Sequence, residues 1–561
     1  MEKAWWKRGI VYEIYPRSFQ DTDGDGIGDL EGIRRRLGYL EWLGVDALWI
    51  APIYPSPMND FGYDVADYTA IHPLFGSMAD FDRLLAEAHG RGLRVLLDLV
   101  PNHTSDQNAW FREAASSRDH PKRDWYLWAD PAPGSGPARE RLPNNWLSEF
   151  GGPAWEWHEA TGQFYYHAFD VSQPDLDWRN PEVRRAMADV MRFWLDKGVD
   201  GFRVDVLWHL VKDDQWRDNP PNPDHDPARE SQYNALVPVF STDQPEVHDV
   251  VAELRSVIDE YDDRLLIGEV YLPISKLVAY YGVERSGAHL PFNFQLVTTP
   301  WDAARVRAVV DEYDASVPAD EWPNWVLGNH DQSRIASRVG PAQARVAAVL
   351  LLTLRGTPTL YYGDELGMEN VPVPPELAKD PREVNDPGRG LGRDPYRSPM
   401  RWSAEANAGF TAAEPWLPVG DGVETTNVEA ERDDPGSMLT LHHRLIALRR
   451  AEPALALGDY EPLPADPPLF AYLRLPAPGD AGRPFAVVLN FGGEPRPWRL
   501  AGTSGTVVLS AREPSRSQER VDGEIEIAGD EALVIALDAE PGASRPETQD
   551  LDPRSRSAGE R

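Results

Sequence analysis

The sequence of 561 residues predicts an α/β fold: a (β/α)8 TIM barrel with an inserted subdomain after its third strand and a C-terminal all-β sandwich domain. Eight short apolar runs alternate with amphipathic helical patterns, which is typical of parallel βαβ units. Two segments break that alternation, one after the third run and one near the end of the chain. An open doubly wound sheet is the rival architecture, but no glycine-rich phosphate loop follows the first run.

The predicted strands are short, apolar and bounded by polar or turn-forming residues. They are IVYEIYP (10–16), ALWIAPI (47–53), LRVLLDLV (93–100), GFRVDV (201–206), LLIGEV (265–270), PFNF (291–294), WVLGNH (325–330) and TLYYGDE (359–365). Helical patterns lie between several of them, for example at 29–44 and 80–92, where apolar residues recur with the period of a helix face. Eight such units are enough to close a barrel.

The other segments give the domain organisation. Residues 104–178 are rich in Trp, Pro, Gly and Asn and are too numerous for a connection without its own structure, so we predict an inserted subdomain there. The barrel then comprises 1–103 and 179–456, the latter ending after a helix at 438–451. Short strands with turn signals predict the β domain over 457–540. The polar, Pro- and Ser-rich segment 541–561 predicts a disordered tail.

Composition excludes several classes of function. With 56 Lys and Arg against 91 Asp and Glu, the net charge is −35, which disfavours binding to nucleic acid or to anionic membranes and favours a small neutral substrate. There is no cysteine, so neither disulfides nor thiolate metal sites are expected. No run of 18 apolar residues occurs, and MEKAWWKRGI lacks the apolar core of a signal peptide, so we predict a cytoplasmic protein. Monomer and homo-oligomer both stay open.

Carboxylates follow several of the predicted strands, where the active site of a barrel lies. In GFRVDV, Arg203 and Asp205 alternate with apolar residues and therefore share one face of the strand. Glu269 ends the fifth strand and Asp331 follows the seventh. The same strand ends carry His103, in DLVPNH, and His330, in VLGNHD.

Such a cluster is typical of glycosidic bond cleavage. One carboxylate attacks the anomeric carbon or activates water, and a second, held protonated, donates to the leaving oxygen. A third supports positive charge in the transition state. We expect Arg203 to keep Asp205 ionised, and the apolar LLIG before Glu269 to raise the pKa of Glu269, as a general acid requires.

From these residues a family can be recognised. The chain resembles the α-amylase superfamily, glycoside hydrolase family 13, in its α-glucosidase and oligo-1,6-glucosidase branch. The resemblance runs from VYEIYPRSF to the β domain and is carried by DLVPNHTS, QPDLDW, GFRVDV, LLIGEVYLP, VLGNHDQSR, GTPTLYYGDELGM and GRDPYRSPMRW. It implies that Asp205 is the nucleophile, Glu269 the general acid/base and Asp331 the transition-state stabiliser.

The same resemblance implies a substrate site for one glucosyl unit. His103, His330 and Arg203 would bind that unit, and Asp60 and Tyr63, in MNDFGYDVADY, would hold its far side. Arg397, in DPYRSPMRW, would pair with Asp60, close the pocket and favour exo-action. Wall positions of the pocket are matched by Phe150, Phe169 and Gln173.

The stretch DTDGDGIGDL (21–30) predicts a separate metal site. Oxygen ligands fall at alternate positions, and Gly26 allows a sharp turn between them; these ligands are the carboxylates of Asp21, Asp23, Asp25 and Asp29 and the carbonyl of Ile27. Position 12 of the loop is Gly32, so the bidentate Glu of a helix–loop–helix calcium sensor is missing. We predict a structural Ca²⁺ site, with Mg²⁺ as the alternative ion and a metal-free turn as the alternative structure.

Three functions are compatible with these motifs. The first is a retaining, exo-acting α-glucosidase acting on short α-glucosides such as maltose or isomaltose. The second is a transglucosidase or glucosyl isomerase, for example a trehalose-forming one, which uses the same carboxylates. The third, a catalytically dead partner subunit of a transporter, would have lost carboxylates that this chain keeps. Val206 resembles the residue associated with α-1,6 linkages, whereas Asp177 in QPDLDW departs from the branch, so linkage preference stays open.

Overall fold

The computed structural model describes residues 4–477 and 482–539 and confirms the predicted barrel. All eight predicted strands form one parallel sheet in the order β10-β11-β1-β2-β3-β7-β8-β9. Their bounds are β1 Val11–Ile14, β2 Ala47–Ile50, β3 Arg94–Leu99, β7 Gly201–Val204, β8 Leu265–Val270, β9 Leu290–Asn293, β10 Asn324–Val326 and β11 Thr357–Tyr361. At the seam between β9 and β10, the Asn324 side chain accepts from the Asn293 N–H (3.0 Å) and donates to the Pro291 carbonyl, so it bridges the strands that close the barrel.

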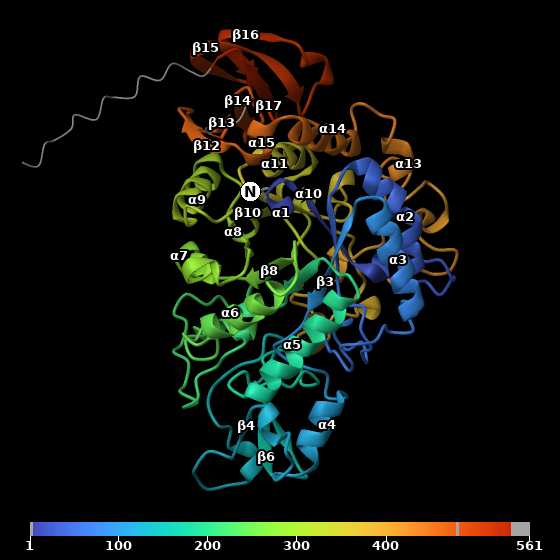
Figure 1. Cartoon of the computed structure of the whole chain (residues 1–561), viewed down its shortest axis with the longest axis vertical. Coiled ribbons are helices and arrows are strands. Elements are labelled where there is room, and N and C mark those ends of the chain that lie inside the picture. Colours follow the sequence, from blue (N-terminus) through green and yellow to red (C-terminus); the bar gives the residue numbers. More distant parts are fainter. Residues whose placement is uncertain (1–3, 478–481, 540–561) are drawn as a thin grey trace, which may run out of the picture.

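Helices pack around the outside of this sheet (Figure 1). They include α2 Leu30–Leu43, α3 Met78–Gly90, α5 Pro181–Asp196, α6 Val247–Ile258, α9 Ala303–Ser316, α11 Pro341–Thr353 and α14 Met438–Ala451. The described chain also has shorter helices in its connections: α1 Trp5–Arg8, α7 Ile274–Leu277, α8 Gln295–Thr298, α10 Ile335–Val339, α12 Pro381–Asn385, α13 Val428–Glu431 and α15 Pro453–Leu457. α2 begins where the Asp29 side chain accepts from the Gly32 N–H and ends at Gly44, whose positive φ of 96° suits a residue without Cβ.

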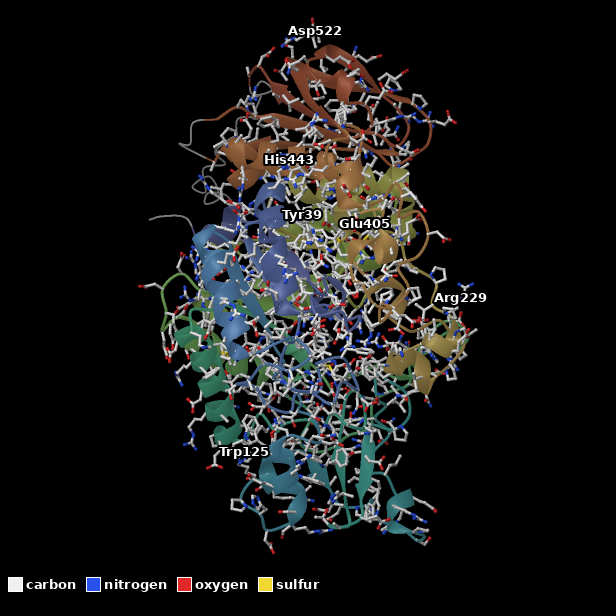
Figure 2. The ribbon with its side chains drawn as sticks, turned by 90° about the vertical axis from the view of Figure 1, so that its right-hand side faces the viewer. Tyr39, Trp125, Arg229, Glu405, His443 and Asp522 are labelled. Atoms are coloured by element: carbon white, nitrogen blue, oxygen red, sulfur yellow. The ribbon has the colours of Figure 1, made fainter. Side chains whose placement is uncertain are left out.

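A segment with its own small sheet follows β3, within the range predicted for the inserted subdomain. It holds α4 Ala109–Ser116 and an antiparallel sheet of three strands in the order β4-β6-β5. The strands are β4 Trp128–Ala129, β5 Trp155–His158 and β6 Gln163–Tyr166. Figure 1 shows this segment at one end of the molecule, with the barrel between it and the C-terminal β domain. Figure 2 marks the same two ends by Trp125 and Asp522.

The C-terminal region is an antiparallel β domain, as predicted. Its strands join in one six-stranded sheet in the order β12-β13-β14-β17-β15-β16. Their bounds are β12 Asp459–Leu463, β13 Leu469–Leu475, β14 Phe485–Asn490, β15 Arg496–Ser510, β16 Arg520–Ile527 and β17 Ala532–Leu537. The sheet curls until β16 approaches β14, and it encloses its own apolar cluster on one face while the other face packs on α11. The predicted tail, 541–561, lies outside the described residues.

Two buried arginines connect the barrel to this β domain. Arg449, on α14, donates to the Leu352 and Leu354 carbonyls at the end of α11 (3.1 Å each) and to the Leu455 carbonyl of α15 (3.0 Å). Arg474, on β13, donates to the same Leu455 carbonyl (3.0 Å) and to Gly458 (2.8 Å). Cations are favourable at helix C-termini, where carbonyls lack partners within the helix. Burial lowers the pKa of Arg449 to about 10 and that of Arg474 to about 9.

Candidate active site

Side chains that point into the barrel form an apolar layer below a charged layer. Alternation along each strand places Val11, Trp49, Leu96 and Ile267 in one buried apolar cluster. Two residues further along, the same faces carry Glu13, Asp98 and Glu269, and Arg203 lies beside Asp98 in the register of β3 and β7. The charged layer therefore sits at the C-terminal ends of the strands, where barrel enzymes have their active sites.

Arg203 is the centre of this layer and is fully buried. Its Nη1 donates to Asp98 Oδ1 (2.9 Å) and to Asp205 Oδ1 (2.8 Å), while its Nη2 lies 2.7 Å from Glu269 Oε2. Asp98 also accepts from Trp49 (3.0 Å) and from Tyr63 (3.1 Å). One guanidinium thus holds three carboxylates side by side, as buried carboxylates require.

The backbone after β7 also donates a hydrogen bond to this group of carboxylates. Val206 has a φ of 39°, an unfavourable conformation for a β-branched residue. In that conformation its N–H donates to Glu269 Oε2 (2.8 Å), and the preceding Asp205 N–H donates to the Leu99 carbonyl (2.8 Å). The first hydrogen bond positions the Glu269 carboxylate, and the second ties the backbone of Asp205 to β3.

The protonation of the pair differs in part from the expectation. Burial raises the pKa of Glu269 to about 7, in the direction expected for a general acid. Burial also raises the pKa of Asp205 well above its usual value, against the opposing effect of Arg203. Arg203 does lower the pKa of Asp205, as expected, but burial acts in the opposite direction and the neighbouring carboxylates Glu269 and Asp98 add to the effect of burial. Two carboxyl groups that are buried close together take up and release protons as a coupled pair.

Asp331 is held by two arginines from one loop. Its Oδ1 accepts from Arg393 Nη1 and from Arg397 Nη2, both at 2.9 Å. Burial alone would raise the pKa of Asp331, but the guanidinium groups of Arg393 and Arg397 outweigh it and hold that pKa well below the usual value. Asp331 is therefore an anion at neutral pH, which suits support of positive charge.

The expected pairing of Arg397 with Asp60 is wrong. Arg393 is the residue that donates to Asp60 Oδ1 (2.6 Å), and it is anchored in turn by Asp380 Oδ2 (2.6 Å). Arg397 is directed elsewhere because its Nε donates to the His330 carbonyl (2.8 Å) and its Nη2 to Asp331. Both arginines lie in GRDPYRSPMRW, so the motif indicated the right loop and the wrong residue.

His330 is fixed from both sides. Its Nδ1 lies 2.5 Å from Glu13 Oε1, and its Nε2 lies 2.7 Å from the Tyr63 hydroxyl and 3.3 Å from Asp331 Oδ2. Burial holds the pKa of His330 well below its usual value, so the ring is neutral. Glu13 was not predicted; its inward place on β1, in VYEIYP, was the available signal.

Behind the cavity lining, Gln173 connects Asp60 to His103. Its amide nitrogen donates to Asp60 Oδ2 (3.1 Å) and lies 3.2 Å from His103 Nε2. Burial lowers the pKa of His103 to about 4. The Phe169 ring packs 5.2 Å from His103 and 5.8 Å from Phe150. The structure thus brings these wall residues together as predicted.

These groups surround a cavity of about 440 Å³, a volume within the range of small-molecule sites. Eight of the predicted residues line it: Asp60, Tyr63, His103, Phe150, Phe169, Asp205, Glu269 and Asp331. The other four, Gln173, Arg203, His330 and Arg397, lie behind this lining and hold it in place through the contacts above. Val206 lines the cavity too, whereas Asp177 does not.

Several lining residues were missed by the sequence analysis. They are Glu149, Trp208, His209, Asn234, Tyr271, Thr298, Gln332, Arg382 and Arg393. Most belong to long loops after strands, where residue type alone does not show which side chain turns inward. Trp208 and His209 had a usable signal, since they follow Asp205 within one turn.

Comparison with known proteins agrees with this geometry. Residues 13–458 match the family described as "Alpha amylase, catalytic domain". The chain belongs to the α-amylase family of glycoside hydrolases. It is 38% identical to maltase A1 of Drosophila melanogaster, over 93% of each chain. It is 39% identical to oligo-1,6-glucosidase of Parageobacillus thermoglucosidasius, over 84% of this chain and 89% of that protein. The crystal structure of an α-glucosyl transfer enzyme superposes with a TM-score of 0.88 at 38% identity, over 96% of this chain and 100% of that one.

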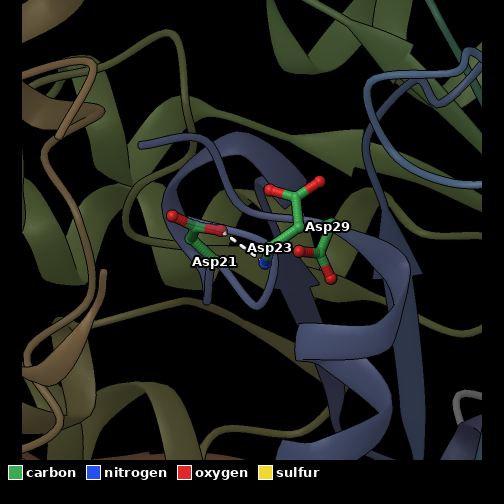
Figure 3. A group of neighbouring side chains, drawn as sticks. All are labelled: Asp21, Asp23 and Asp29. Atoms are coloured by element: carbon green, nitrogen blue, oxygen red, sulfur yellow. Dashed lines mark hydrogen bonds between the residues drawn. The ribbon is translucent and has the colours of Figure 1, made fainter. Parts of the chain in front are cut away.

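Outside the hydrolase cavity, the structure brings together three of the four aspartates predicted as metal ligands. Asp21, Asp23 and Asp29 each offer a carboxylate oxygen, and these atoms lie within 4.8 Å of one another (Figure 3). Asp25 is not part of this group; its carboxylate accepts from the Ile27 N–H (2.8 Å). In the described parts of the chain, no hydrogen bond occupies the Ile27 carbonyl. The donors are all oxygens, which fits a hard cation such as Ca²⁺ or Mg²⁺.

No described helix of this glycoside hydrolase is both long enough and apolar enough to cross a membrane.

Proposed function

We propose that this glycoside hydrolase is a retaining, exo-acting α-glucosidase that hydrolyses short α-glucosides such as maltose or isomaltose. The observation that carries the proposal is the pair Asp205 and Glu269, which the two terminal nitrogens of Arg203 hold together on the cavity wall. Retaining glycosidases need two carboxyl groups about 5–5.5 Å apart, so that one can attack the sugar directly.

The residues act in two steps. Asp205 attacks the anomeric carbon while the Glu269 carboxyl gives its proton to the glycosidic oxygen, so the bond to the leaving group breaks and a glucosyl-enzyme ester forms. The Glu269 carboxylate then takes a proton from water, whose oxygen attacks the same carbon and releases Asp205. Asp331, which is ionised, offsets the positive charge that develops on the sugar ring in both steps.

The inner end of the cavity supports exo-action. Arg393 joins Asp60, Asp331 and Asp380 there, and it is only 4% exposed. We expect this network to block a chain that would extend beyond the glucosyl unit. Its hydrogen-bonding groups match the hydroxyls at the non-reducing end of a glucoside.

We also propose that the loop 21–29 binds Ca²⁺, with Mg²⁺ as the alternative. Asp21, Asp23, Asp29 and the Ile27 carbonyl would hold the ion, and Asp25 would have to turn from the Ile27 N–H to join them. The ion would supply positive charge to the loop that leads into α2. The location in the cytoplasm stays a prediction.

Initial rates with product identification test the proposed activity. We expect the enzyme to release glucose from maltose or isomaltose, and to act on an aryl α-glucoside, with the α-anomer formed first. Asp205→Asn should abolish turnover and keep sugar binding. A β-anomer as the first product, or full activity of Asp205→Asn, would contradict the mechanism.

The similarity to an α-glucosyl transfer enzyme favours transglucosylation as the second candidate. Product analysis at high maltose separates the two functions. Mostly free glucose excludes the transferase, and a dominant disaccharide or longer transfer product excludes the hydrolase.

A further inference from the structure

Glu13 is a fully buried carboxyl group of the charged layer that pairs with no described arginine or lysine. Its side chain points into the barrel from β1, whereas the preceding Tyr12 points outward and donates to Glu365 (2.7 Å). Within the described chain its ion-pairing partner is His330, and its Oε2 atom has no hydrogen-bond partner. A buried carboxylate anion is costly without a cation and a full set of hydrogen bonds, so these surroundings favour the protonated form.

The other carboxylates of this layer have different surroundings, because each contacts a guanidinium group. Asp331, for example, lies 2.9 Å from Arg393. Burial raises the pKa of Glu13 well above its usual value; Arg203 opposes this effect, and the anionic Asp331 adds to it. The missing cation and the unpaired oxygen therefore agree with the direction of this pKa.

Glu13 and His330 share one proton. Oε1 of Glu13 lies 2.5 Å from Nδ1 of His330, and two acceptor atoms approach so closely only with a proton between them. With that proton on the ring, Glu13 would be the buried anion that its surroundings disfavour. With the proton on the carboxyl group, Nδ1 is the acceptor, and the N–H of the neutral ring is at Nε2.

The contacts of Nε2 favour the second arrangement. Nε2 lies 2.7 Å from the Tyr63 hydroxyl and 3.3 Å from Asp331 Oδ2, and the Tyr63 hydroxyl donates to Asp98 Oδ2 (3.1 Å). A hydroxyl has one hydrogen, so Tyr63 cannot donate to Asp98 and to Nε2 at once. With the N–H at Nε2, the ring donates to Tyr63 and Tyr63 donates to Asp98, so that each donor has an acceptor. The anionic Asp331 then faces an N–H and not a lone pair.

We infer that Glu13 is a positioning residue of the sugar site: its protonated carboxyl group donates to His330 Nδ1 and fixes the tautomer of that ring, with the N–H at Nε2. Nε2 is the nitrogen on the side of Tyr63 and Asp331, which line the cavity. The inference rests on the proposed α-glucosidase activity only for its effect on catalysis. His330 then acts toward the cavity as a neutral donor, and Glu13 adds no further negative charge to the neighbouring acids.

Nitrogen NMR of the enzyme with labelled histidines reads this tautomer directly, without substrate. His330→Asn identifies the signals of the ring by their loss. At neutral pH we expect the wild type to show a bare Nδ1 and a protonated Nε2. Glu13→Met removes the donor and should expose the second tautomer, whereas Glu13→Gln should restore the wild-type pattern, because its amide N–H can donate to Nδ1. A protonated Nδ1 in the wild type, or an unchanged pattern in Glu13→Met, would overturn the inference.

Kinetics test the consequence for catalysis. We expect Glu13→Met to lower kcat/KM on maltose or isomaltose roughly tenfold, the effect of one hydrogen bond lost at a buried polar group. Glu13→Gln should recover most of that loss, because it restores a neutral donor of the same shape. Equal losses in both variants would show that the site needs the carboxylate charge, and would overturn the neutral role of Glu13.

The matched control is Glu365→Met. Glu365 is another fully buried carboxyl group, but it accepts from Tyr12 and Tyr39 (2.7 Å each) outside the cavity. Its replacement should lower the Tm and leave the ring nitrogens of His330 unchanged; a changed pattern would show that the tautomer reports general destabilisation, against the inference. A wild type inactive on every α-glucoside would overturn the proposed function, whereas the NMR result would still decide the tautomer.

Discussion

The catalytic cavity and the loop 21–29 both gather carboxylates, but they balance the negative charge in opposite ways. In the cavity, arginine side chains contact the acids directly, as Arg203 and Arg393 each do with three of them. In the loop, the carboxylates accept mainly from N–H groups of their own turn, and no described arginine or lysine pairs with them. A buried cluster thus carries fixed cations, whereas a partly exposed one can take a mobile cation from solvent.

The largest loss of activity is expected when a buried arginine of the cavity is removed. Arg393→Ala leaves Asp60, Asp331 and Asp380 without their shared partner, and removing one member of a buried ion pair costs about 3–5 kcal/mol. We expect kcat/KM on maltose to fall about 10²- to 10³-fold, with little recovery in Arg393→Lys, since one ammonium lacks the fork geometry of a guanidinium.

The control for this substitution is Arg520→Ala, which removes an exposed arginine paired with Asp538 in the β domain. Its kcat/KM should equal that of the wild type. If Arg393→Ala kept its activity within tenfold, the cavity would not depend on this fixed cation, and the contrast with the loop would lose its basis.

The pH dependence of activity tests the protonation of the carboxylates in the cavity. Burial raises the pKa of Glu269 to about 7, and the protonated carboxyl is the form that can donate to the leaving oxygen. We therefore expect kcat/KM on maltose to fall as the pH rises above about 7, by about tenfold per unit on the alkaline limb. An aryl glucoside with a good leaving group needs less protonation and should show a shallower fall. A flat profile between about pH 6 and 9 would contradict the assignment of Glu269 as the acid.

The smallest effect is expected at the loop, and it concerns stability more than activity. Removal of Ca²⁺ with EDTA should lower the Tm by a few degrees, because an ion present at 100 times its Kd stabilises the folded chain by about 2.7 kcal/mol. Asp21→Asn should abolish that response, whereas Asp25→Asn, outside the carboxylate group, should reduce it less. Identical melting with EDTA and with excess Ca²⁺ would show that the loop needs no ion.

Periodicity and strand-end residues predicted the barrel and the three central acids, because alternation along a strand fixes which side chains point inward. Arg203 and Asp205 in GFRVDV are the clearest example. Strand alternation could not identify the partner of Asp60, because Arg393 and Arg397 lie in an irregular loop. In such a loop, residue spacing does not determine the direction of a side chain. The extent to which burial opposes Arg203 at Asp205 also could not be predicted, because it depends on carboxylates that three different strands bring to one guanidinium.

The two arginines between barrel and β domain have a consequence for the architecture as a whole. Arg474 belongs to the β domain, yet it donates to two carbonyls in the segment that leads into this domain. The Leu455 carbonyl also accepts from Arg449, whereas the Gly458 carbonyl accepts from Arg474. The last barrel helix, α15, is thus hydrogen-bonded to a side chain of the neighbouring domain. We therefore expect the β domain not to be a detachable module, and to unfold in one cooperative unit with the barrel that carries the sugar site.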